Sequence, residues 1–166
     1  MTTTSTPHPV VTRDRWLAER KALLVREKAM SRLRDDLARD REQLPWVRID
    51  ATYVFDTREG PRTLAELFAG RRQLIVQHFM LAPGWEEGCT GCSFMADHVD
   101  GALPHLAARD VSFVAVSRAP RAAIARFRLR MGWRFPWVSS HGNRFNFDFH
   151  VSFTEEARQR GEVYYN

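Results

Sequence analysis

The feature that most constrains the fold is an apolar run that leads directly into a pair of cysteines. Residues 73–81 form a short uncharged run, Gln-Leu-Ile-Val-Gln-His-Phe-Met-Leu, preceded by arginines and followed by a proline. Such a run is typical of a strand buried inside a sheet. A helix is predicted from about Cys89 to Arg109, kinked or split by a glycine and Pro104. The thiols of Cys89 and Cys92 are therefore expected where a buried strand gives way to a helix.

Strands and helices alternate along the rest of this region. Strands are predicted over 46–55, 111–117 and 147–153, helices over 63–68 and 121–131, and a loop over 135–146. Such alternation indicates a mainly parallel central sheet with helices on both faces. We therefore expect an α/β domain over residues 45–166.

Residues 13–44 have a different character. Charges are dense, glycine and proline are absent, and apolar side chains recur every seven residues, at Trp16, Leu23, Met30, Leu37 and Leu44. This pattern predicts a long N-terminal amphipathic helix that ends before Pro45, an arm that packs on its own domain or on a second copy of the chain. The Thr/Ser/Pro-rich residues 1–12 are predicted to form a disordered leader.

Composition argues against a membrane protein. The longest uncharged stretch, residues 73–85, has 13 residues, which is too short and too polar to span a bilayer. The N-terminal residues have neither the basic region nor the apolar run of a secretory signal. We therefore expect a cytoplasmic protein without a membrane partner.

The positive charge of the chain is concentrated in one segment. The formal net charge is +5, yet between Asp110 and Asp148 there are seven arginines and no acidic residue. Arginines alternate with aromatic residues over 126–135, as they do in grooves that bind single-stranded nucleic acid. Phe127 and Met131, however, fall on the face predicted to pack on the sheet. A nucleic-acid partner is therefore not favoured.

The Cys-x-x-Cys spacing points to redox chemistry. A thiol in the first turn of a helix has a lowered pKa and becomes a nucleophilic thiolate, the role predicted for Cys89. Cys92 lies three residues later and would resolve a mixed disulfide. Glu86 and Glu87 would raise the pKa of Cys89, and Arg118 is expected to offset them.

Other readings of the two cysteines stay open. They could be inert thiols or half of a metal site, although a zinc site needs two more ligands and the histidines are scattered. We predict neither a metal nor a bound cofactor. Candidate substrate-binding residues are Trp85, Arg118, Trp133 and Trp137, of which the last two are expected in an aromatic cluster near the cysteines.

Several strings of this sequence resemble domain-of-unknown-function family 899, a bacterial thioredoxin-like group. Among them are Gln77-His78-Phe79-Met80, Gly88-Cys89-Thr90-Gly91-Cys92-Ser93, Val116-Ser117-Arg118-Ala119-Pro120 and Phe135-Pro136-Trp137-Val138-Ser139-Ser140. The resemblance covers nearly the whole chain from about Trp16 onward. It implies a thioredoxin-like three-layer fold close to the peroxiredoxin branch, and it does not imply a particular activity.

Three departures from related patterns affect this expectation. Thioredoxins usually have Trp before the first cysteine and Pro inside the motif, where this chain has Gly88, Thr90 and Gly91. Peroxiredoxins usually have Thr or Ser three residues before the reactive cysteine, where this chain has Glu86. Members of the family usually continue beyond Asn166, so the closing strands and the cis-proline loop are predicted to be missing.

Two functions from different classes follow. The first is a thiol–disulfide oxidoreductase that acts on a protein or a small thiol or disulfide. The second is a non-catalytic thioredoxin-like module that associates with itself or with a protein partner. It would do so through its N-terminal helix and an open sheet edge, which favours a homo-oligomer.

Overall fold

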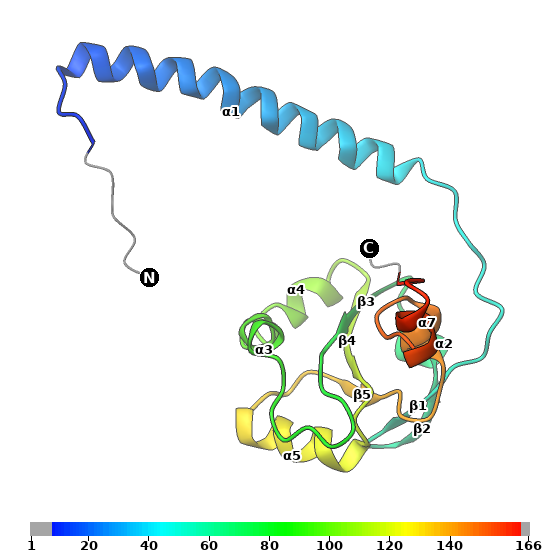
Figure 1. Cartoon of the computed structure of the whole chain (residues 1–166). Helices are drawn as coiled ribbons and strands as arrows, with labels where there is room; N and C mark the ends of the chain where they lie inside the picture. The colour runs from blue at the N-terminus through cyan, green and yellow to red at the C-terminus, as the bar shows by residue number, and fades with distance from the viewer. Residues whose placement is uncertain (1–7, 164–166) are drawn as a thin grey trace. The chain divides into compact units, whose positions relative to one another are not determined.

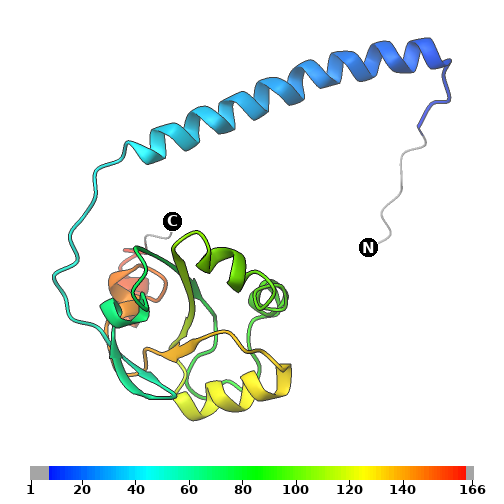
Figure 2. The same ribbon diagram turned by 180° about the vertical axis from the view of Figure 1, so that it is seen from behind.

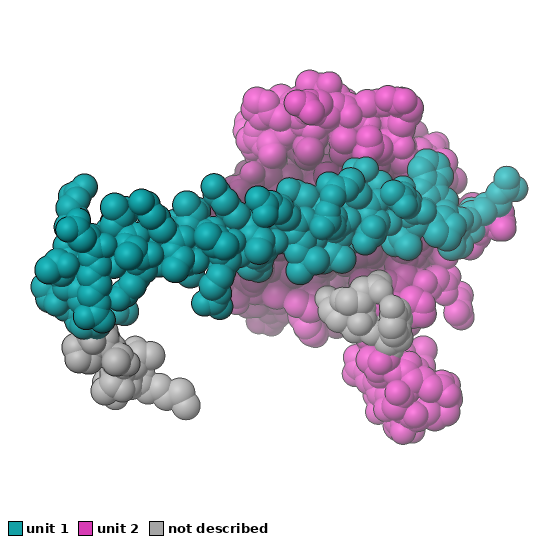
Figure 3. Space-filling view, turned by 90° about the horizontal axis from the view of Figure 1, so that it is seen from above, with its two compact units in different colours: residues 1–49 teal, residues 50–166 magenta. Residues whose placement is uncertain are grey.

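Residues 13–42 form one continuous helix, α1 (Arg13–Glu42), and the remaining elements all belong to a separate α/β unit. The computed structural model describes residues 8–163, and the chain divides into two units, residues 1–49 and 50–166 (Figure 3). Thr12 caps α1 through a hydrogen bond from the Arg15 amide to its hydroxyl, at 3.4 Å. The predicted helix is thus confirmed, ending two residues earlier than expected. Of the predicted leader, residues 1–7 lie outside the described part of the chain.

The second unit is built on a five-stranded sheet with the order β2-β1-β5-β4-β3. The strands are β1 (Val54–Thr57), β2 (Gly60–Thr63), β3 (Gln73–His78), β4 (Val111–Ser117) and β5 (Trp137–Ser139). β4 pairs in parallel with β3 and β5, whereas β1 pairs in antiparallel fashion with β2 and β5. The sheet is therefore mixed: the expected parallel pairing holds for β3, β4 and β5 and does not extend to β1 and β2.

Helices cover both faces of this sheet (Figures 1 and 2). They are α2 (Leu64–Leu67), α3 (Thr90–Ala96), α4 (Leu103–Ala107), α5 (Arg121–Met131), α6 (Phe145–Asp148) and α7 (Glu155–Gln159). One core cluster joins α3, α4 and α5 to the sheet, and a second joins α2 and α6 to its other face. Alternate residues of β4 serve the two clusters, with Ala115 in the first and Val114 and Val116 in the second. The α/β architecture with three layers follows from this alternation.

Two predicted segments near β1 and β5 were wrong in extent. A strand was expected over 46–55, but β1 begins only at Val54 and continues to Thr57. These four residues are the ones that pair with β2 in the hairpin. The segment 135–146, expected to be a loop, contains β5. β5 is three residues long and buried throughout, so it lacks the alternation by which a strand is recognised.

The strand predicted over 147–153 does not form. Phe145–Asp148 is instead a helical turn, and the rings of Phe145 and Phe149 are in contact, tilted by 40° with centroids 4.5 Å apart. Four residues separate these rings, which is the helical repeat and not the strand repeat. In residues 8–163 no strand follows β5. β3 forms one edge of the sheet and none of its residues is buried, so the expectation of a strand buried inside the sheet was wrong.

Candidate dithiol site

The two cysteines lie at the beginning of α3, directly beyond the end of β3. The Cys89 amide donates a hydrogen bond to the Met80 carbonyl at 3.0 Å, and the Gln77 side-chain amide donates to the Cys92 carbonyl at 3.2 Å. Ser93 donates both its amide and its hydroxyl to the Cys89 carbonyl. These bonds hold the start of α3 against the end of the strand, as the sequence predicts.

Gly88 allows the loop to pass closely over the core. A Cβ at this position would lie 2.6 Å from Cε1 of Phe79 and 3.1 Å from Cζ of Phe127. No larger residue fits without moving both rings. The departure from the thioredoxin pattern at this position therefore has a steric reason, since aromatic side chains occupy the space that a tryptophan would need.

Cys89 is the N-cap of α3, and its sulfur accepts a hydrogen bond from the Cys92 amide at 3.4 Å. This backbone hydrogen bond is the largest influence on the thiol and lowers the pKa of Cys89, and a hydrogen bond with the Cys92 side chain lowers it further. The predicted position at the start of the helix is confirmed. A lowered pKa increases the thiolate fraction of a thiol, and the thiolate is the nucleophilic form.

Cys92 has contrasting surroundings. Its side chain is partly buried and packs against the aromatic core cluster that contains Phe79, Trp133 and Trp137. Burial is the main cause that raises the pKa of Cys92, although a hydrogen bond from the Met80 backbone acts in the opposite direction. Both cysteines are free thiols. The pKa values of the two thiols are therefore shifted in opposite directions, with Cys89 the more acidic of the two.

The carboxylate nearest to the motif is neutralised by a different arginine from the one predicted. Arg130 on α5 donates two hydrogen bonds to Glu87, one of them at 2.7 Å, and lowers the pKa of that carboxyl. The guanidinium carbon of Arg130 also lies 4.6 Å from the ring centroid of Phe127. Arg118 is held elsewhere, 4.8 Å from the ring centroid of Phe147. The expectation that Arg118 offsets Glu87 was wrong, because helix α5 presents Arg130 to that side.

The candidate tryptophans divide into a surface residue and two core residues. Trp85 is 51% exposed, whereas Trp133 and Trp137 are buried. The Trp133 indole donates to Asp97 at 2.8 Å, and the Trp137 indole donates to Ser117 at 2.9 Å. The aromatic cluster near the cysteines is present as predicted, but its two tryptophans form the wall behind Cys92 and do not face an incoming molecule.

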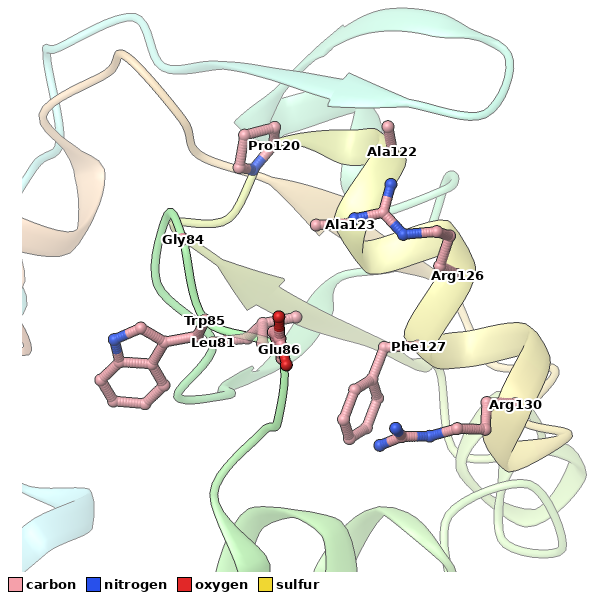
Figure 4. Close-up of a pocket in the computed structure, with 10 residues that line it drawn as sticks. All are labelled: Leu81, Gly84, Trp85, Glu86, Pro120, Ala122, Ala123, Arg126, Phe127 and Arg130. Atoms are coloured by element: carbon pink, nitrogen blue, oxygen red, sulfur yellow. The ribbon is translucent and has the colours of Figure 1, made fainter.

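Two cavities flank Trp85. The first, drawn in Figure 4, lies between the loop before Cys89 and helix α5; Glu86 projects from the loop, and Arg126 and Arg130 project from the helix. The second has a volume of about 310 Å³ and reaches the dithiol, because Cys92 lines it together with Arg118. Trp85, Cys92 and Arg118, three of the predicted site residues, thus meet in one cavity.

The sequence analysis missed two residues of this second cavity. His78, at the end of β3, stacks on Phe145, and burial lowers its pKa. Arg158 comes from α7, far along the chain from the cysteines. His78 could have been found from its place at the end of the strand that leads to the motif. No local pattern marks Arg158, because only the fold brings α7 to this end of β3.

A scan against family models matched residues 5–165 to a family described as "Bacterial protein of unknown function (DUF899)". The chain belongs to this family. No match was found among curated proteins or among solved structures. Membership in DUF899 agrees with the resemblance seen in the sequence and leaves the activity open.

The arginine-rich segment of this DUF899 protein forms no continuous free surface. Four of its seven arginines pair with carboxylates, namely Arg121 with Asp56, Arg130 with Glu87, Arg134 with Asp100 and Arg144 with Asp148. Arg128 donates to two backbone carbonyls. The four carboxylates offset four of the seven positive charges of this segment.

Two further observations concern metals and membranes. Within residues 8–163, no three side chains of His, Cys, Asp or Glu are grouped as a metal site requires. None of the helices described is both long enough and apolar enough to cross a membrane.

Proposed function

We propose that this protein is a thiol–disulfide oxidoreductase of thioredoxin-like fold, in which Cys89 is the attacking thiol and Cys92 the resolving thiol. The single observation that carries this proposal is the asymmetry of the pair. Cys89 accepts a backbone hydrogen bond that lowers its pKa, whereas burial raises the pKa of Cys92. Both thiols are partly buried. A more acidic thiol beside a less acidic one suits thiol–disulfide exchange, because the thiolate is the attacking form.

The reaction proceeds in two exchanges. The Cys89 thiolate attacks one sulfur of a substrate disulfide, forms a mixed disulfide and releases the first substrate thiolate. Cys92 then loses its proton to water and attacks the Cys89 sulfur, which releases the second substrate thiolate and leaves a Cys89–Cys92 disulfide. The protein dithiol gives up two electrons, and the substrate disulfide is reduced to two thiols. A second dithiol reduces the protein again by the same exchange in reverse.

The architecture supports a thioredoxin-like assignment. β3 leads into the dithiol and then α3, and the chain returns through β4 parallel to β3, with α3, α4 and α5 packed on one face. A reducing cytoplasm would keep both cysteines in the free state that they have here. A resident cofactor is not needed for either exchange.

The test uses a neutral disulfide and the two cysteines of the whole chain. Reduced protein is mixed with excess 2,2′-dithiodipyridine, and pyridine-2-thione release is followed by absorbance. We expect two thiones per chain, a Cys89–Cys92 disulfide in the peptide map, and a first phase faster than free cysteine at pH 6. Reaction no faster than free cysteine, with no disulfide between the two residues, would overturn the proposal.

A second candidate function is association through α1. None of the residues of α1 is buried, and its seven-residue stripe includes Trp16, 56% exposed, and Met30, 63% exposed. We propose that this stripe mediates contact with a second copy of the chain. Sedimentation velocity of a variant with Leu23, Met30 and Leu37 changed to Gln tests it, because a homo-oligomer would become a monomer. An unchanged oligomeric state in the variant would exclude this role for α1.

A further inference from the structure

We infer that the substrate of the dithiol is a small disulfide that carries carboxylate groups, and that it binds in the cavity lined by Cys92, Arg118 and Arg158. This inference rests on the proposed oxidoreductase function and specifies its substrate class. It is carried by the shape of the cavity, its charge and its position beside the resolving thiol.

The cavity is assembled from segments that are distant in sequence. The end of β3, the loop at Trp85, Cys92 of α3, Arg118 after β4, and residues 151–153 contribute to its lining. The amides of Val151 and Ser152 both donate to the Asn146 carbonyl, which folds this segment back beside α6. The volume of about 310 Å³ lies at the lower end of the range for small-molecule sites, and favours a compact ligand.

The charge of the cavity has one sign. Arg118 and Arg158 line it, and no aspartate or glutamate does. Neither arginine pairs with a carboxylate in residues 8–163, whereas most other arginines near the site do. The ring of Phe147 under Arg118 holds that guanidinium in place without neutralising it. Two unpaired guanidinium groups in a concave site are suited to bind carboxylates.

Nearby acidic residues are already engaged. Asp148 accepts hydrogen bonds from Tyr53 and Arg144. On α7, Glu155 accepts from Gln159, and a hydrogen bond from its own backbone amide lowers the pKa of Glu156. The neutral donors leave Glu155 and Glu156 negatively charged, but neither of these carboxylates nor Asp148 lines the cavity.

Most of the remaining lining is apolar and adjoins Cys92, although His78, Asn146 and Ser152 also contribute to it. Phe79 and Leu81 are buried in its floor, and Trp85 stands at its rim. A ligand with its carboxylates on Arg118 and Arg158 would place its sulfurs over this apolar side, next to Cys92. Exchange then follows the two steps given above: Cys89 takes up one half of the ligand, and Cys92 displaces it as the second thiolate. The cavity thus binds the half of the ligand that forms the mixed disulfide with Cys89 and is released in the second step.

Two aromatic disulfides of opposite character test the charge requirement. 5,5′-Dithiobis(2-nitrobenzoate) carries two carboxylates, and 2,2′-dithiodipyridine carries none. The rate ratio of the two probes, measured on the reduced full chain, is compared between wild type and the variants Arg118→Gln and Arg158→Gln. We expect each variant to lower this ratio about tenfold, since one hydrogen-bonded ion pair at a partly enclosed site is lost. Higher ionic strength should lower the wild-type ratio.

A matched control comes from the neighbouring cavity. Arg126→Gln removes the same charge on the other side of Trp85, in the cavity of Figure 4, and should leave the ratio unchanged. A second variant, Arg158→Glu, reverses the charge at this position. It should fold, because Arg158 is exposed. It should react faster than wild type with cystamine, a disulfide with two ammonium groups.

The outcomes separate the two proposals. If the neutral probe reacts rapidly but Arg118→Gln, Arg158→Gln and Arg126→Gln all leave the ratio unchanged, the substrate class is wrong and the dithiol chemistry stands. If Arg126→Gln lowered the rate ratio equally, binding in this cavity would also be overturned as the explanation. The overall electrostatic field of the protein would then account for the preference. A folded protein disulfide such as insulin reduced faster than either probe would overturn it too. If wild type oxidises with neither probe, the oxidoreductase function itself fails.

Discussion

The surroundings of Cys89 and of Cys92 are two different regions of the molecule, although the residues are one helical turn apart. Around Cys89 the contacts are polar and local: the Cys92 amide, the Met80 carbonyl and the hydroxyl of Ser93. Around Cys92 they are apolar and long-range, because the aromatic cluster behind it combines residues of the loop, of α5 and of the segment before β5.

This difference shows how one motif produces two thiols with different roles. Local hydrogen bonding stabilises a thiolate, and burial destabilises one. The first depends on the backbone at the start of α3, and the second depends on the packing of the whole unit. Changes that separate these two causes are the way to test the account.

The largest effect is expected from removing each sulfur in turn. Cys89→Ser should slow the reaction with disulfides on the order of 100-fold or more, because the serine hydroxyl is not ionised at neutral pH. Cys92→Ser should react nearly as fast as wild type but stop at a stable mixed disulfide on residue 89. Stopped-flow absorbance gives the rates, and intact mass gives the adduct. Equal rates for the two variants would contradict the different roles assigned to Cys89 and Cys92.

The two glycines on either side of Cys89 separate core packing from local structure. Gly88→Ala should destabilise the protein by about 1–3 kcal/mol, because the new methyl group clashes with Phe79 and Phe127. Gly91→Ala is the matched control: its Cβ would lie 3.9 Å from the Cys89 sulfur, an ordinary contact, and alanine favours a helix. Urea unfolding followed by tryptophan fluorescence measures both. Equal stability of the two variants would contradict the close approach at Gly88.

The smallest effect is expected from the ion pair at Glu87. Arg130→Gln leaves that carboxylate unneutralised two residues from Cys89, which should raise the pKa of the thiol and slow alkylation at pH 7 about two- to fivefold. Arg134→Gln, which disrupts an ion pair with Asp100, serves as the control and should have no effect. The double variant with Glu87→Gln should recover the wild-type rate. A failure to recover would mean that Arg130 acts by another route.

Much of this site could be predicted from sequence, because its main determinants are local. The apolar run of β3, the cysteine spacing and the N-cap position of Cys89 all follow from residues close together in the chain. What could not be predicted depends on packing at a distance. That Arg130 faces Glu87 is set by the helical phase of α5, and Arg158 reaches the cavity only through the placement of α7.

The fold, too, could be predicted only where a local sequence pattern marks the element. The apolar runs of β3 and β4 and the seven-residue repeat of α1 predicted these three elements, but the edge position of β3 was not predicted. β5 is too short to show a pattern, and the phenylalanines of residues 145–153 fit both a strand and a helical turn until His78 and Tyr53 are placed beside them.

The most direct test of the central claim is the pH dependence of alkylation of each cysteine, followed by mass spectrometry of the reduced full chain. The account predicts that Cys89 reacts at lower pH than Cys92, with a midpoint below that of an ordinary thiol, and that Cys92 titrates above it. Alkylation of both residues with one common midpoint, or of Cys92 first, would contradict the asymmetry on which the proposed function rests.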